Sequence, residues 1–142
     1  MNALVDTSVW SLALRRKSPH LTAAERAVVG ELADLAWEGR ARIIGLIRHE
    51  LLSGIKTAAQ YEKLRLALRA FPDEVIETSD YEGAAKVSND FRSQGIAATV
   101  MDALICQIAL ARGWSIFTTD SDFKSYARVL PIKLHAPRAT SK

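Results

Sequence analysis

The sequence is poor in the residues that build disulfides and nitrogen- or sulfur-ligated metal sites. It has one cysteine, Cys106, and three histidines among 142 residues. A single cysteine cannot form a disulfide within the chain, which favours a reducing compartment, so we expect a cytoplasmic protein. Cys106 lies in an apolar helical run and is interpreted as a core residue. The histidines show no metal-ligand spacing, which disfavours a zinc site and a nuclease built on a histidine pair.

Long apolar runs and phosphate-binding loops are also missing. The N-terminus lacks the basic segment and cleavage site of a signal peptide, so we expect none. The most apolar stretch, 96–111, is interrupted by Asp102 and Gln107, so we expect no membrane association. No Gly-x-x-x-x-Gly-Lys loop occurs, which disfavours P-loop nucleotide hydrolysis. Without repeats or linkers, the chain is predicted to form one domain over 1–136, followed by a C-terminal tail over 137–142.

Strand-like and helix-like segments alternate along the chain. Thr22-x-x-Glu25 and Ser79-x-x-Glu82 have the pattern of capping boxes, and Thr99 precedes a nearly all-apolar helix. The alternation predicts a single α/β domain with a central parallel sheet flanked by helices on both faces in three layers. The strands are expected at 2–6, 41–45, 74–77, 114–118 and 132–134.

Four acidic residues lie where such a fold places functional groups, at the carboxyl ends of its strands. Asp6 and Asp120 each close a strand, while Glu50 and Asp102 lie in helices near the same edge. Asp102 interrupts the most apolar helix, where an ionised carboxylate is costly unless it reaches a polar cleft, a partner or a cation. If the four converge, repulsion raises their pKa values unless a cation neutralises them. Such oxygen ligands suit Mg²⁺ or Mn²⁺.

Each of these acids also has a plainer interpretation. Asp6 could cap the helix after the first strand, and Asp120 or Asp122 could cap the last helix. Asp102 could complete a capping box with the threonine three residues before it and interact with the helix dipole. Glu50, taken alone, would be a solvated helix residue. These alternatives stay open on the sequence.

Four segments of the sequence resemble the PIN domains, and specifically the VapC-type toxins of bacterial and archaeal toxin–antitoxin pairs. They are "LVDTSVW", "HELLSG", "MDALICQIALARG" and "FTTDSDF", and their order and spacing span almost the whole chain. The resemblance implies that residues 1–136 form a PIN-like nuclease domain in which acidic residues hold one or two divalent ions, Mg²⁺ or Mn²⁺, and cleave RNA. These catalytic and metal-binding residues would be Asp6, Glu50, Asp102 and Asp120.

Further residues are expected to support the acids or the substrate. Thr7, Ser8 and Thr118 are placed to hydrogen-bond the carboxylates, and Asp122 matches a position that is commonly acidic in the family. The chain carries a formal net charge of +3, and basic side chains around an acidic pocket would suit an RNA backbone. The resemblance also implies a homodimer and a cognate VapB-like antitoxin protein. The expected RNA-binding residues are Arg15, Arg16, Lys17, Arg48 and Lys124.

Other functions remain open on the sequence. A PIN-like module could bind RNA or protein without cutting, although a pure binder has no need to hold repelling carboxylates together. A receiver-like phosphoacceptor domain would want paired acids after the first strand, where only Asp6 occurs, and a lysine at a late strand end, where Thr118 and Thr119 occur. The Asp-x-Asp of residues 120–122 is typical of haloacid-dehalogenase-like phosphatases, but there it opens the domain.

Overall fold

A short, buried parallel sheet organises the chain. The computed structural model describes residues 1–15 and 18–139. In it, β1 (Ala3–Val5) lies between β2 (Ala41–Arg42) and β3 (Ser115–Phe117), and all three strands run in parallel. Every residue of β1 and β3 is buried, as expected for a parallel sheet covered on both faces. The carboxyl ends of β1 and β3 therefore meet at one edge.

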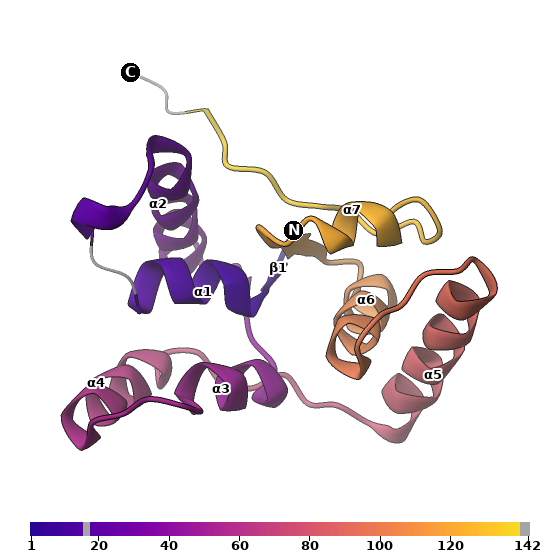
Figure 1. Ribbon diagram of the computed structural model, residues 1–142, viewed down its shortest axis with the longest axis horizontal. Helices are drawn as coiled ribbons and strands as arrows, with labels where there is room; N and C mark the ends of the chain where they lie inside the picture. Colours follow the sequence, from indigo (N-terminus) through magenta and orange to yellow (C-terminus); the bar gives the residue numbers. More distant parts are fainter. Residues whose placement is uncertain (16–17, 140–142) are drawn as a thin grey trace.

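Helices lie on either side of this sheet. In Figure 1, α1 to α4 lie to the left of β1, and α5 and α6 lie to its right. This arrangement confirms the predicted α/β domain with a central parallel sheet. No helix among residues 1–15 and 18–139 combines the length and apolar character needed to cross a membrane. The helices are α1 (Thr7–Leu14), α2 (Ala23–Trp37), α3 (Gly45–Leu52), α4 (Ala58–Leu68), α5 (Thr78–Ser93), α6 (Val100–Arg112) and α7 (Asp122–Tyr126), with a 3-10 turn over Ser18–His20.

Helix α6 is the buried helix behind the sheet. It packs against α5, β1 and β3. The hydroxyl oxygen of Thr99 accepts a hydrogen bond from the backbone N–H of Asp102 at 3.0 Å, which confirms the predicted cap. The helix ends at Gly113, whose φ of +69° is accessible to glycine at little cost. Cys106 is fully buried, as predicted, and desolvation raises the pKa of its thiol to about 12.

Two of the predicted strands are wrong. Residues 74–77 and 132–134 are not strands, and the chain makes only isolated parallel bridges nearby, Ile43 with Asp73 and Ile116 with Leu134. One side chain of α6, that of Arg112, holds the first of these segments as a loop. Arg112 donates to the Glu74 carboxylate at 2.8 Å and to the Val75 carbonyl at 2.9 Å.

The start of α5 also differs from the prediction. The capping box is formed by Glu77 and Asp80, two residues before the predicted Ser79 and Glu82. The Asp80 carboxylate accepts a hydrogen bond from the Glu77 backbone N–H at 2.9 Å and two more from Arg112. This guanidinium and the backbone N–H hold the pKa of Asp80 below its usual range. The distant Arg112 therefore decides which acid caps the helix.

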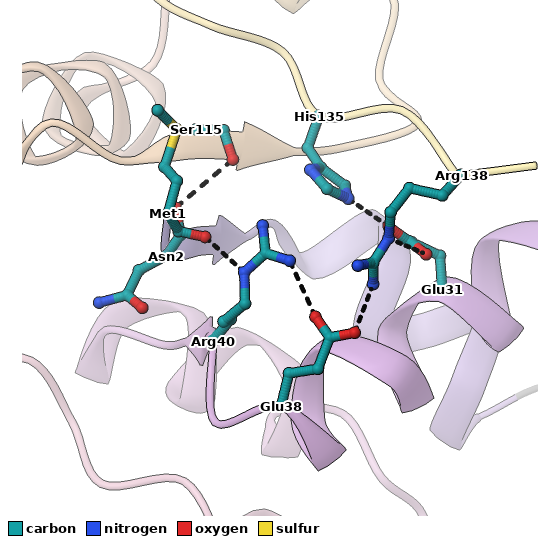
Figure 2. Close-up of polar contacts among 8 residues, drawn as sticks. All are labelled: Met1, Asn2, Glu31, Glu38, Arg40, Ser115, His135 and Arg138. Carbon is teal, nitrogen blue, oxygen red and sulfur yellow. Dashed lines mark hydrogen bonds and ion pairs between the residues drawn. The ribbon is translucent and has the colours of Figure 1, made fainter.

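A charged network joins the C-terminal segment to α2 (Figure 2). Glu31, only 4% exposed, interacts with His135 and accepts a hydrogen bond from Arg138 at 2.9 Å. Arg138 also pairs with Glu38, which in turn pairs with Arg40. Burial acts to raise the pKa of Glu31, but the hydrogen bonds and charges of His135 and Arg138 outweigh it and lower the pKa. Part of the predicted tail is thus held against α2.

We expect Glu31→Gln to lower the free energy of unfolding near neutral pH by about 1.5–3 kcal/mol, the range for a hydrogen bond to a charged group. Because the folded pKa of Glu31 is lowered, its contribution is present above the ordinary pKa of 4.5 and is lost as pH falls through the folded value. Urea unfolding of both proteins, near neutral pH and in acid, measures this. Glu38→Gln, in the same network but more exposed, is the control and should lose less. Equal losses from the two substitutions would contradict the prediction.

Candidate metal centre

The pairing of β1 with β3 places Asp6 beside Thr118. Val5 pairs with Phe117, and the backbone N–H of Asp6 donates to the Phe117 carbonyl at 2.9 Å, so the ladder continues one residue beyond the strands. Neighbouring residues in a parallel register point to the same face. The Thr118 hydroxyl accordingly donates to Asp6 Oδ2 at 2.8 Å.

Asp6 is held as a carboxylate acceptor and does not cap α1. It is 7% exposed, and its side chain makes no capping hydrogen bond although it occupies the N-cap position. A second hydroxyl, that of Ser8, donates to the same Oδ2 at 2.8 Å. Ser8 Oγ also accepts from the backbone N–H of Thr119 at 3.0 Å. Ser8 and Thr118 thus make hydrogen bonds of the kind that the sequence predicted, and their role at a metal site stays a prediction.

Thr7 does not make the hydrogen bond that was predicted for it. Its hydroxyl oxygen is buried and has no hydrogen-bond partner among residues 1–15 and 18–139. Consecutive helix residues project about 100° apart, so Ser8, and not Thr7, faces the Asp6 carboxylate.

Asp102 reaches the same region from the first turn of α6. Its Oδ2 accepts a hydrogen bond from the Tyr126 hydroxyl at 2.6 Å, and Thr99 caps the helix through the Asp102 backbone N–H. Asp102 is half-buried, and this desolvation is the main reason that its pKa is raised. The negative charges of Asp6 and Asp120 raise it further, against the lowering effect of Tyr126.

Asp120 and Asp122 bring two further carboxylates to Asp102. One oxygen from each of the three lies within 4.8 Å of the others. Asp120 also accepts a hydrogen bond from the backbone N–H of Asp122 at 2.9 Å, an Asx turn that starts α7. The N-cap residue of α7 is Ser121, so Asp120 hydrogen-bonds the first residue of the helix without occupying its cap position.

This group carries negative charge without a matching cationic side chain. Within the described residues, Asp6, Asp102, Asp120 and Asp122 form no ion pair with lysine, arginine or histidine. Their ligand atoms are all carboxylate oxygens, which fit a hard cation such as Mg²⁺ or Mn²⁺ and not a zinc site of nitrogen and sulfur. A divalent cation would relieve the repulsion that raises the pKa of Asp102.

The other predicted site residues lie outside this group. Glu50 is exposed on α3, and its convergence with the aspartates stays a prediction. Arg48 is engaged inside the protein, where it donates to Asp73 at 2.9 Å and to the carbonyls of Leu68 and Phe71. These contacts use three of its five N–H donors, and the RNA contact predicted for Arg48 stays a prediction.

Two of the remaining basic residues predicted to bind RNA lie at the surface. Arg15 and Lys124 are exposed, and Lys124 lies on α7 two residues after Asp122. Arg16 and Lys17 lie outside the described residues. The RNA contacts predicted for these four side chains stay predictions.

Tyr126 is the residue of the site that sequence reasoning missed. It follows Asp122 by four residues, so both lie on one face of α7. Burial, its hydrogen bond to Asp102 and the nearby charges of Asp102, Asp122 and Asp120 all raise the pKa of its hydroxyl, which stays protonated. The four-residue spacing from Asp122 to Tyr126 can be seen in the sequence, but an aromatic residue at such a position usually indicates only that this face of the helix is buried.

The sequence matches one family model. The model is described as the PIN domain, and the match covers residues 3–129. No curated protein matches the sequence significantly.

Several solved structures share the fold. VapBC2 from Rickettsia felis, bound to a DNA fragment from its promoter, has a TM-score of 0.72 and 17% identity, covering 95% of this chain and 98% of that one. FitAcB from Neisseria gonorrhoeae has a TM-score of 0.73 and 18% identity, with 95% and 97% covered. VapBC-5 from Mycobacterium tuberculosis has a TM-score of 0.66 and 15% identity, with 94% and 96% covered. At these identities the likeness shows the fold.

We expect Asp6→Asn to leave the metal-free protein as stable as the parent or about 1 kcal/mol more stable. Two carboxylates roughly 5 Å apart repel by about 3 kcal/mol at an effective dielectric of 20, before screening. Asparagine keeps an acceptor for Ser8 and Thr118 but removes one charge that acts on Asp102. Thermal melts in EDTA and in excess Mg²⁺ measure this, and Mg²⁺ should raise the melting temperature of the parent more.

Asp34→Asn, at an exposed position on α2, is the matched control and should respond to Mg²⁺ like the parent. An Asp6→Asn protein that melts earlier in EDTA, yet is stabilised by Mg²⁺ as much as the parent, would show that Asp6 is structural.

Proposed function

The chain belongs to the PIN domain family, and on that premise we propose that it is a divalent-metal-dependent endoribonuclease that acts as the toxin of a toxin–antitoxin pair. The observation that carries the proposal is the group of Asp102, Asp120 and Asp122 within 4.8 Å, with Asp6 close enough to raise the pKa of Asp102. A chain that only bound RNA would gain nothing from this repulsion. The substrate, the metal and the toxin role are the proposed parts.

The aspartates would hold Mg²⁺ or Mn²⁺, with Glu50 on α3 as a further candidate. When bound, a divalent cation supplies charge neutralisation at the phosphate and activates water for attack. The protein's own contribution is orientation. Ser8 and Thr118 both donate to Oδ2 of Asp6, which leaves Oδ1 to face the cation or to accept a proton from the attacking water.

RNA would reach this centre along a basic surface. Arg15 and Lys124 are exposed and available to phosphates, and Arg16 and Lys17 extend the basic run in the sequence. Phosphate contacts of this kind supply most of the affinity and little sequence selectivity. We therefore propose that these residues bind the backbone of the substrate.

A cognate antitoxin and a second copy of the chain are the proposed protein partners. Support comes from the neighbours in fold, which were solved as VapBC and FitAB-type complexes. Exposed apolar side chains on α2 and α4 offer contact area for such partners. They include Trp37, 92% exposed, together with Tyr61 and Leu66.

The purified protein is expected to cleave structured RNA in Mg²⁺ or Mn²⁺, and EDTA should abolish the cleavage. Asp102→Asn removes one charge from the acidic group and should lower the rate by at least about a hundredfold, whereas the control Asp34→Asn should cleave like the parent. Gel analysis of defined transcripts, with and without chelator, measures both. RNA that is bound but left intact by the parent would favour a non-catalytic binding module. Cleavage that survives chelation would exclude the metal mechanism.

Expression of the chain in bacteria without its partner should arrest growth. Asp102→Ala should relieve the arrest while the protein stays folded, because the site and not the fold is damaged. Growth curves, with circular dichroism of the purified variant, test this. Equal arrest by the parent and by Asp102→Ala would separate toxicity from the acidic group. No arrest, even in the native host after deletion of the partner, would contradict the toxin role.

A further inference from the structure

The tyrosine beneath the acidic group occupies an unusual place for a polar residue. Tyr126 ends α7 and is 1% exposed, so its ring belongs to the core. Only its hydroxyl reaches the site, where it donates to Asp102 Oδ2 at 2.6 Å. A short hydrogen bond of this kind to a carboxylate is stronger than one between neutral groups.

Two other aromatic rings fix the position of this hydroxyl. The ring of Tyr126 stacks on Phe91 of α5 with centroids 4.7 Å apart. Phe123, one turn earlier on α7, meets it edge-on with centroids 5.0 Å apart. Phe91 and Phe123 are both fully buried. Because a packed core holds side chains in single rotamers, the hydroxyl cannot follow Asp102 if the carboxylate turns. Asp102 must instead adapt to Tyr126.

Asp102 is therefore fixed at two points. The Thr99 hydroxyl holds its backbone N–H, and Tyr126 occupies Oδ2 of its side chain. Because Tyr126 binds Oδ2, it does not compete for the second carboxylate oxygen, Oδ1. A lysine or arginine in place of Tyr126 would orient the carboxylate but would also neutralise it and compete with a cation. The neutral hydroxyl orients it and leaves its charge in place.

The same hydrogen bond sets the spacing between two helices. Asp122 begins α7 and Tyr126 ends it, while Asp102 lies on α6. We propose that Tyr126 is a positioning residue that holds the Asp102 carboxylate and the Asp120–Asp122 segment at the separation a divalent cation requires. This inference rests on the proposed function, because it assumes that the acidic group binds a metal.

Tyr126→Phe tests the inference, because it removes the hydroxyl and keeps the packed ring. We expect the dissociation constant for Mn²⁺, measured by calorimetry on the full chain, to rise about tenfold or more, as is usual when a partner of a metal ligand is lost. In RNA cleavage, kcat should fall while KM stays unchanged, because Tyr126 is buried and does not touch RNA.

Tyr81→Phe, at an exposed tyrosine of α5, is the matched control and should behave as the parent. A hydroxyl that only fastened α7 to α6 would lower the melting temperature in EDTA and leave the Mn²⁺ affinity and kcat unchanged. That result would overturn the inference.

A spectroscopic measurement avoids any dependence on the folding of Tyr126→Phe. The chain has three tyrosines, so replacing Tyr61 and Tyr81 with phenylalanine leaves Tyr126 alone to carry a 3-fluorotyrosine label. Its fluorine resonance should move on Mg²⁺ addition and saturate at the concentration that saturates thermal stabilisation. A resonance that stays fixed while Mg²⁺ stabilises the protein would overturn the inference.

The outcomes separate this inference from the function on which it rests. If the parent binds Mn²⁺ and cleaves RNA, and Tyr126→Phe matches Tyr81→Phe in both, the positioning role alone is wrong. If the parent neither binds Mn²⁺ nor cleaves RNA, the proposed function is wrong and the positioning role is excluded with it.

Discussion

The pairing of β1 with β3 is the constraint on which the rest of the molecule depends. It aligns Leu4 with Ile116 in the middle of the sheet and continues through the hydrogen bond from the Asp6 N–H to the Phe117 carbonyl. A shift of one residue would turn Asp6 away from Thr118 and place an apolar side chain in the site, because strand side chains alternate between faces. Burial of every residue in both strands makes that shift costly, so the core specifies the position of the acids.

The acidic edge shows how the protein tolerates like charges close together. The carboxylates are oriented by neutral donors, namely the hydroxyls of Ser8, Thr118 and Tyr126 and the backbone N–H of Asp122. Arginine orients carboxylates elsewhere in the molecule: Arg112 pairs with Asp80 and Glu74, and Arg138 pairs with Glu31. Arginine pairs thus fasten loops and the C-terminal segment, while the aspartates of the sheet edge keep their charge. Such a site lowers the stability of the metal-free protein, as functional sites commonly do.

Sequence reasoning succeeded where the structure is decided locally and failed where a distant partner decides it. The cap at Thr99, the buried α6 and the acids at strand ends follow from neighbouring residues and from the alternation of strand and helix. The strand predicted at 74–77 was wrong because Arg112, far along the chain, donates hydrogen bonds to the Glu74 carboxylate and the Val75 carbonyl. Arg48 looked like a free cation, but Asp73 and two backbone carbonyls bind it. Tyr126 was missed for the same reason, because the hydrogen bond from its hydroxyl to Asp102 depends on the packing of α7 against α6 and cannot be seen in the sequence.

The order of synthesis gives the β1–β3 pair a further consequence. The two strands are neighbours in space, but more than a hundred residues lie between them, so β1 leaves the ribosome long before its partner exists. At about 5–20 residues per second, this interval lasts roughly 6–20 s. Asp6 emerges early without Thr118 to orient it, and Asp102, Asp120 and Asp122 follow roughly a hundred residues later. Throughout this interval Asp6 stays apart from the other aspartates, and the acidic group assembles only when β3 pairs with β1.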